Sequence, residues 1–148
     1  MAFQIQQVDQ DSSKIFLLFD EVSGAMAKVA PSYGFNLFSL AFQVNQQPIS
    51  IITEPERPSE LAKFPSRFGH PILFPFPNRI SGGKFHWEGQ DYEIPVTNGG
   101  NAIHGFAHTA EWRVVETLTN DDSASITGEF RLSRDAPEHL RHWPADAQ

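Results

Sequence analysis

The chain has 148 residues, of which 40% are hydrophobic and 20% are charged, and this is the size and composition of one globular domain. Its formal net charge of −7 argues against a nucleic-acid backbone or an anionic membrane surface as the main partner. The sequence has no cysteine, which excludes disulfides and suits the reducing cytoplasm, and it shows neither a signal peptide nor an apolar run long enough to cross a bilayer.

The N-terminal third has the pattern of consecutive strands. Alternating or short continuous apolar runs predict strands at residues 3–8, 14–20, 25–30, 35–44 and 48–53, the last two forming a hairpin. In the strand at 35–44, one face would be strongly apolar, formed by Asn36, Phe38, Leu40, Phe42 and Val44. Residues 54–68 contain three prolines and predict a loop with at most a turn or two of helix at 59–63.

The stretch from residue 69 to residue 112 holds seven of the ten glycines and four of the six histidines. Glycine and proline at this density exclude a long helix, and the short aromatic or β-branched pieces at 72–74, 83–87 and 92–94 predict strands joined by tight turns. Such a stiff backbone carrying polar side chains is what a small polar ligand requires. The polar candidates are Asn78, Arg79, His86, Asp91, Asn101, His104 and His108.

The remaining residues complete a mostly antiparallel β protein. Strands are predicted at 112–119 and 123–132, joined by the turn at 120–122, and residues 133–148 form a polar segment.

Two side chains in the central stretch are candidates for chemistry. His104 follows a Gly-Gly-Asn turn and precedes Gly105, so its backbone can approach a ligand closely, but the same position suits a structural histidine that caps a loop. Arg79 can bind a ligand oxygen with its fork of donors, although spacing alone favours a role in bracing a turn carbonyl.

Other chemistries lack their patterns. His70 and His86 read as structural or solvent-facing histidines, and Gly105 argues against a helical metal pair of His104 and His108. A zinc site would also need a third ligand at recognisable spacing. Neither a nucleophile elbow nor a phosphate-binding glycine loop is present, so we expect no metal and no cofactor.

Two motifs make the chain resemble the aldose 1-epimerase (galactose mutarotase) family. The first is Asn78-Arg79-Ile80, followed by Gly83, Phe85, Gly89 and Tyr92, and the second is NAIHGF at residues 101–106, followed by Trp112. Residues 30–37 also resemble the first core strands of the family, and residues 69–75 resemble the lead-in to its asparagine–arginine turn. The similarity runs from about residue 27 to the end of the chain.

The resemblance implies an antiparallel β-sandwich of the galactose mutarotase-like supersandwich type, with a monosaccharide such as glucose or galactose bound on its concave sheet. It implies interconversion of the α and β anomers of a free aldose. On that pattern Arg79 binds sugar hydroxyls with the help of Asn78, and His104 is the first of two catalytic histidines, near the ring oxygen and the anomeric carbon. The two side chains are expected to project toward one concave surface.

The family's second histidine and its glutamate base belong to a later part of a longer chain. We therefore expect residues 1–148 to be the N-terminal part of one such domain, carrying half a site and showing negligible mutarotase activity alone. An incomplete sandwich would have an open strand edge and an uncovered apolar face, which predicts self-association or a partly molten monomer.

Two alternatives stay open. One is a carbohydrate-binding module that uses the same cleft without turnover. The other is a hexose-6-phosphate 1-epimerase, for which Arg57, Arg67 and Arg113 are candidate phosphate ligands.

Overall fold

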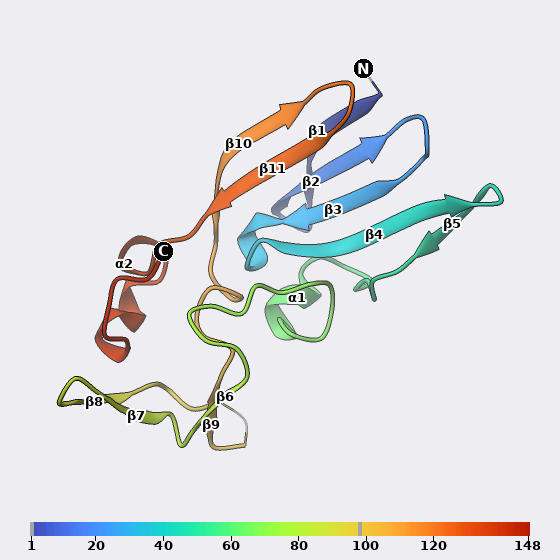
Figure 1. Cartoon of the computed structure of the whole chain (residues 1–148). Coiled ribbons are helices and arrows are strands. Elements are labelled where there is room, and N and C mark those ends of the chain that lie inside the picture. The colour runs from blue at the N-terminus through green and yellow to red at the C-terminus, as the bar shows by residue number, and fades with distance from the viewer. Residues whose placement is uncertain (1, 98) are drawn as a thin grey trace.

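The largest element is an antiparallel sheet of five strands in which each strand pairs with the next along the chain (Figure 1). The structure is a computed structural model and describes residues 2–97 and 99–148. The strands of this sheet are β1 (Phe3–Gln10), β2 (Ser13–Asp20), β3 (Met26–Ala30), β4 (Asn36–Val44) and β5 (Gln47–Ser50).

Two-residue turns set the register of this sheet. Residues 11 and 12, between β1 and β2, both have left-handed backbone, with φ of 50° and 62°, and residues 45 and 46, between β4 and β5, have φ of 51° and 62°. Turns with two left-handed residues match the twist of antiparallel strands and close hairpins tightly. The hairpins expected from the alternating patterns are therefore present.

A bulge in β4 corrects the expected alternation of residues 36–44. The pairing with β3 shifts register between Lys28 and Val29, so Phe38 and its neighbour Ser39 are both buried. Beyond the bulge, Phe42 and Val44 of the expected apolar face are not part of the core. Their exposed fractions are 43% and 46%.

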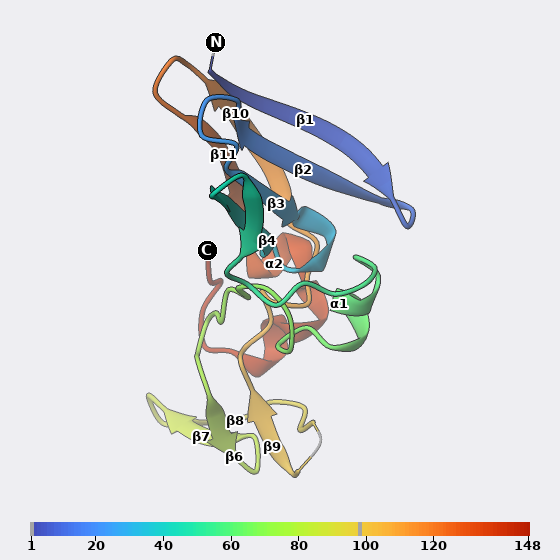
Figure 2. The ribbon, with the colours of Figure 1, turned by 90° about the vertical axis from the view of Figure 1, so that its right-hand side faces the viewer.

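A second layer lies against β1 and β2. It is the hairpin of β10 (Arg113–Thr119) and β11 (Ala124–Glu129), which faces these two strands (Figure 2). The strand expected to reach residue 132 ends at Glu129, and the segment expected to be merely polar contains α2 (Leu132–Asp135) and the 3-10 helix η2 (Pro137–His142). Leu132 is fully buried, which explains why the chain turns inward there.

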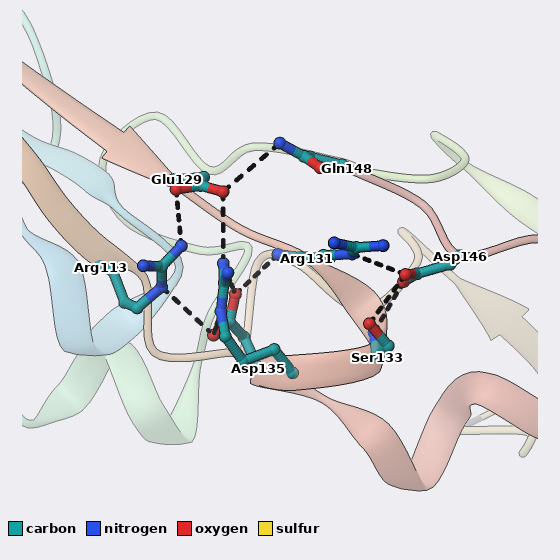
Figure 3. Close-up of polar contacts among 8 residues, drawn as sticks. Arg113, Glu129, Arg131, Ser133, Asp135, Asp146 and Gln148 are labelled. Carbon is teal, nitrogen blue, oxygen red and sulfur yellow. Dashed lines mark hydrogen bonds and ion pairs between the residues drawn. The ribbon is translucent and has the colours of Figure 1, made fainter.

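A network of ion pairs joins this hairpin to α2 and to the C-terminal residues (Figure 3). Arg113 pairs with Glu129 at 2.6 Å, and Arg131 pairs with Asp146 at 2.6 Å. The carboxylate of Asp135 accepts a hydrogen bond from Arg134 Nε at 2.9 Å. These contacts fix the base of the hairpin relative to the segment that follows it.

The glycine- and proline-rich stretch forms two small antiparallel pairs below the large sheet (Figure 2). The strands are β6 (Arg79–Ser81), which pairs with β9 (Asn101–Ile103), and β7 (Lys84–Trp87), which pairs with β8 (Gln90–Glu93). Residues 72–74 are not the strand that we expected. Prolines at 71, 75 and 77 supply no backbone donors, and only an isolated bridge joins Phe74 to Gly105.

Two hydrophobic clusters hold these parts together. The smaller one packs under the large sheet and includes Ile15, Phe38 and Leu61, the last from the short helix α1 (Glu60–Lys63). The 3-10 helix η1 (Pro31–Tyr33) contributes Tyr33 to its margin. The larger cluster joins the β6–β9 region to β11 and α2. Within residues 2–97 and 99–148, no helix has both the length and the apolarity needed to cross a membrane.

Candidate functional site

The two sequence motifs meet at one corner of the fold. β6 and β9 pair antiparallel with Arg79 opposite Ile103, so the residue before β6 lies opposite the residue after β9. The His104 backbone N–H donates a hydrogen bond to the Asn78 carbonyl oxygen at 2.9 Å. Residues 78–81 and 101–105, which we call the β6–β9 corner, therefore bring Asn78, Arg79 and His104 together although they are far apart in sequence.

The backbone at this corner is in an unusual conformation. Asn78 has a φ of 56° and His104 has a φ of 64°. Left-handed backbone costs a residue other than glycine about 1–2 kcal/mol, and asparagine tolerates it better than histidine. Strain of this kind in two facing residues is typical of sites where the side chain must point in a set direction.

Gly105 makes the turn after His104 possible. It also has left-handed backbone, with a φ of 70°, and a Cβ atom there would overlap the Phe74 carbonyl. That carbonyl accepts hydrogen bonds from the N–H groups of Phe106 at 2.8 Å and Ala107 at 3.0 Å. The chain after His104 is thereby held against the segment that leads into Asn78.

The polar groups of the first motif face solvent. Arg79 Nη1 donates a hydrogen bond to Asn78 Oδ1 at 2.9 Å, and both side chains are exposed. Among the residues that the structure describes, Arg79 makes no ion pair with a carboxylate. The contact with Asn78 orients the guanidinium and leaves further N–H donors able to bind the oxygen atoms of a ligand.

His104 lies against His108, which the sequence places among the polar candidates but to which it assigns no role. The rings of His104 and His108 meet edge to face with centroids 5.9 Å apart. His108 is only 7% exposed, and the Nδ1 atoms of both rings are buried without a hydrogen-bond partner in the described part of the chain. Burial, and second the nearby His104, lower the pKa of His108 from 6.5 to about 4, so His108 is neutral at pH 7.

An aromatic layer supports the corner from below. Phe106, 4% exposed, stacks on the ring of His139 from η2 with centroids 4.4 Å apart. It also meets Phe76 edge to face at 6.2 Å and belongs to the larger hydrophobic cluster. Burial lowers the pKa of His139 as well. The residue two positions after His104 is thus anchored in the core.

The other candidate histidines lie in different surroundings. His86 is on β7 and pairs with Asp91 on β8 at 2.7 Å, with both side chains exposed. His70 is exposed, and its backbone N–H donates to Asn36 Oδ1 at 2.8 Å. Asn101 holds two turns, since its Oδ1 accepts from the Gly82 N–H after β6 at 3.3 Å and its Nδ2 donates to the Gly99 carbonyl at 3.3 Å.

Two of the three arginines considered for a phosphate contact other side chains. Arg113 is engaged by carboxylates, with Glu129 at 2.6 Å and Asp135 at 3.8 Å. Arg67 lies over the rings of Phe64 and Phe68, at 5.5 and 5.6 Å from their centroids. A hollow of about 870 Å³ lies beside Arg113, between β1, β2, β10 and α2, and none of the three motif residues lines it.

The donor set at the corner consists of an amide, a guanidinium and imidazoles. Such groups suit a neutral polyhydroxyl ligand, to which they can donate and from which they can accept hydrogen bonds. Within the described ranges, no group of three histidine or acidic side chains is arranged to hold a metal ion.

Solved structures place this fold with the galactose mutarotase-like proteins. A galactose mutarotase-like protein from Clostridium acetobutylicum superposes with a TM-score of 0.79 and 24% identity, covering 95% of this chain and 42% of that one. Galactose 1-epimerase from Lactobacillus acidophilus gives a TM-score of 0.65 at 17% identity, covering 87% of this chain and 39% of that one. At these identities the likeness establishes the shared fold.

The sequence establishes the family. Residues 19–148 match the family described as aldose 1-epimerase, and the chain belongs to that family. Among curated Escherichia coli proteins, YihR is 33% identical over 64 residues, covering 42% of this chain and 20% of the relative. YphB is 36% identical over 61 residues, covering 40% and 20%. The matched segment thus spans about a fifth of the length of these curated relatives.

The resemblance predicts roles for Asn78, Arg79 and His104 and assigns none to His108. The spacing of four residues between His104 and His108 would suit a helical metal pair, but Gly105 between them argues against a helix. The contact forms through a turn in place of a helix, and the Gly105 that excluded the helix is what allows that turn. The sequence feature that indicates this contact is a pair of histidines four residues apart with Gly105 between them.

Proposed function

We propose that Asn78, Arg79 and His104 form the sugar-binding part of an aldose 1-epimerase site, for a free hexose such as glucose or galactose. The observation that carries this proposal is the backbone hydrogen bond of 2.9 Å between His104 and Asn78, which joins the two family motifs in one corner. Membership of the aldose 1-epimerase family supports the choice of an aldose as ligand.

The proposed reaction is acid–base anomer interconversion. A base takes the proton of the anomeric hydroxyl, an acid protonates the ring oxygen, and the ring opens. Rotation about the first carbon–carbon bond and reclosure then give the other anomer. Each proton transfer contributes roughly 10²–10⁴-fold to the rate, and an imidazole titrates in the range that such transfers need.

In this proposal Arg79 and Asn78 hold the sugar and His104 exchanges protons with it. The guanidinium, oriented by its 2.9 Å contact with Asn78 Oδ1, donates to sugar hydroxyls. His104 lies next to both because of the pairing of β6 and β9. Its proposed place is near the ring oxygen and the anomeric carbon.

A free aldose is favoured over a sugar phosphate because two of the three candidate arginines already contact other side chains. Arg113 is neutralised by Glu129 and Asp135, and Arg67 lies over two phenylalanine rings. A clear preference for hexose 6-phosphate over free hexose in a binding assay would select the sugar-phosphate alternative.

Sugar binding without turnover is a second candidate for residues 1–148. Anomer interconversion needs an acid and a base, and His108, the titratable neighbour of His104, has a pKa of about 4 and is therefore not present as the imidazolium acid at pH 7. Within the described residues, His104 makes no hydrogen bond or ion pair with a carboxylate. The residues present then supply sugar contacts and one acid–base group.

Polarimetry on α-glucose and α-galactose separates the two candidates. We expect the 148-residue chain to change optical rotation no faster than the buffer blank. A rate well above the blank that His104→Ala abolishes would show that the chain contains the second proton-transfer group and is an enzyme by itself.

Residues 1–148 are further proposed to be part of one mutarotase-like domain in the cytoplasm and to associate with a second copy of the chain. The edge strand β5 supports the association. Among the strands of residues 2–97 and 99–148 it pairs with β4 alone, and all its residues are exposed. Exposed strand edges recruit other chains through their unpaired backbone groups.

A further inference from the structure

We infer that His108 is a positioning residue for His104: it closes the Nδ1 side of that ring, so that protons reach His104 only through Nε2. The inference rests on the proposed function in assigning His104 a role in proton exchange. The geometry on which it stands is independent of any sugar.

The first observation is the contact between the two rings. His104 and His108 meet at a centroid distance of 5.9 Å and an interplanar angle of 86°. The Nδ1 atom of His104 is buried and has no hydrogen-bond partner within the described residues. A neutral imidazole has one donor and one acceptor nitrogen, and the nitrogen that exchanges protons must reach solvent or ligand. With Nδ1 closed off, Nε2 is the nitrogen available for that exchange.

The second observation is that His108 cannot move away easily. Its side chain is only 7% exposed, and the alanine before it is held by two hydrogen bonds. Ala107 N–H donates to the Phe74 carbonyl at 3.0 Å, and its carbonyl accepts from Trp112 Nε1 at 2.8 Å. A ring fixed in this way can hold the orientation of its neighbour.

Packing from the large sheet completes this restraint. The loop before β4 passes so close to His108 that a Cβ atom on Gly34 would overlap the His108 carbonyl. Gly34 N–H also donates to the Ala110 carbonyl at 2.9 Å. The loop before β4 therefore holds the backbone of His108 in place, and the ring of His108 in turn contacts the ring of His104.

The electrostatics agree with a positioning role. His108 is neutral at pH 7, because burial and then the nearby His104 lower its pKa to about 4. After burial, the titratable group that contributes to this lowering is His104.

Nitrogen NMR of the histidine rings in the full 148-residue chain tests the inference. In the wild-type chain above pH 7, we expect His104 to populate one neutral tautomer, because only one of its nitrogens meets water. His108→Ala removes the covering ring, so both tautomers become populated and the ring-nitrogen signals of His104 shift toward each other. A single unchanged tautomer in His108→Ala would overturn the inference.

His108→Phe is the matched variant, because it keeps a ring of the same shape without its nitrogens. We expect it to preserve the wild-type tautomer, and a mixture in this variant would show that covering Nδ1 is not what selects the tautomer. Slow amide exchange of His104, whose N–H bonds to Asn78, reports whether the corner is still folded in each variant. This test uses no sugar, so its failure would leave the sugar-binding proposal standing. Failure of the sugar-binding proposal would likewise leave the packing of His108 against His104 standing.

Discussion

At the scale of single residues, the candidate site depends on two side chains with strained backbone and one buried imidazole. Asn78 and His104 have left-handed φ values of 56° and 64°, and one hydrogen bond links them. The cost of this strain must be offset by the surrounding packing. The buried ring of His108 is part of that packing, and its environment makes the stability of the protein depend on pH.

We predict that the protein loses stability as the pH falls from 6.5 to 4. Folding lowers the pKa of His108 from 6.5 to about 4, so the unfolded chain takes up a proton at a pH where the folded chain does not. The contribution of His108 to the free energy of unfolding is fully present above pH 6.5. It falls by up to roughly 3 kcal/mol as the pH approaches 4. The lowered pKa of His139 acts in the same direction.

Urea unfolding at a series of pH values measures this dependence. His108→Phe and His108→Leu both remove the titrating group, so each should give a flatter slope than the wild-type chain between pH 6.5 and 4. Parallel slopes in wild type and both variants would show that His108 is not held neutral by the fold.

At the scale of elements, the corner between β6 and β9 is fixed by the turn at Gly105. A side chain there would adopt left-handed backbone, with a φ of 70°, and would overlap the Phe74 carbonyl. The matched position is Gly89 in the β7–β8 hairpin, where φ is 81° and no atom lies within 4 Å of an added Cβ.

We predict that Gly105→Ala destabilises the protein more than Gly89→Ala does. Both variants place alanine in left-handed backbone, at a cost of about 1 kcal/mol. Gly105→Ala must also displace Phe74 and break its hydrogen bonds to Phe106 and Ala107, which adds roughly 1–3 kcal/mol. Equal losses in thermal or urea unfolding would show that the contact with Phe74 carries no energy.

The sequence predicted the elements that depend on local patterns. The five strands of the large sheet and the β10–β11 hairpin follow from alternation and two- or three-residue turns, which act over a few residues. β6 and β9 were missed, because each has only three residues and they pair across more than 15 intervening positions. The short helices of the C-terminal segment were missed for a similar reason, since α2 spans four residues.

The site was predictable in part. Its motif residues came from the resemblance to a family, and the contact between residues 78 and 104 follows from a strand pairing that no local pattern reveals. His108 could not be assigned from the sequence, because its contact with His104 depends on the turn at Gly105 and on packing from Gly34.

At the scale of the whole molecule, the β4–β5 end of the large sheet exposes apolar side chains. The β10–β11 hairpin lies over β1 and β2, whereas the apolar side chains at the end of β4, in β5 and at the residue after β5 are largely exposed. Phe42, Val44, Ile49 and Ile51 are 43%, 46%, 47% and 61% exposed. Neighbouring exposed apolar side chains at a sheet edge mark an association surface.

We predict that the chain self-associates at micromolar concentration through this surface. The double variant Ile49→Lys/Ile51→Lys places two charges on it without touching either buried cluster, so it should shift the chain toward monomer in sedimentation velocity. A wild-type chain that stays monomeric and melts in one sharp transition would contradict this, and would mean that the two clusters already form a sufficient core.

The central claim is that the β6–β9 corner binds a free aldose through Arg79 and His104. Amide NMR shifts during titration with galactose or glucose test it most directly. We expect saturable shifts in residues 78–81 and 101–105 for the wild-type chain and for His86→Ala, whose changed side chain lies on the separate β7–β8 hairpin. Binding should weaken about tenfold or more in Arg79→Ala, since charged hydrogen bonds contribute roughly 1.5–3 kcal/mol. Shifts located elsewhere, or equal affinity in wild type, Arg79→Ala and His104→Ala, would contradict the account.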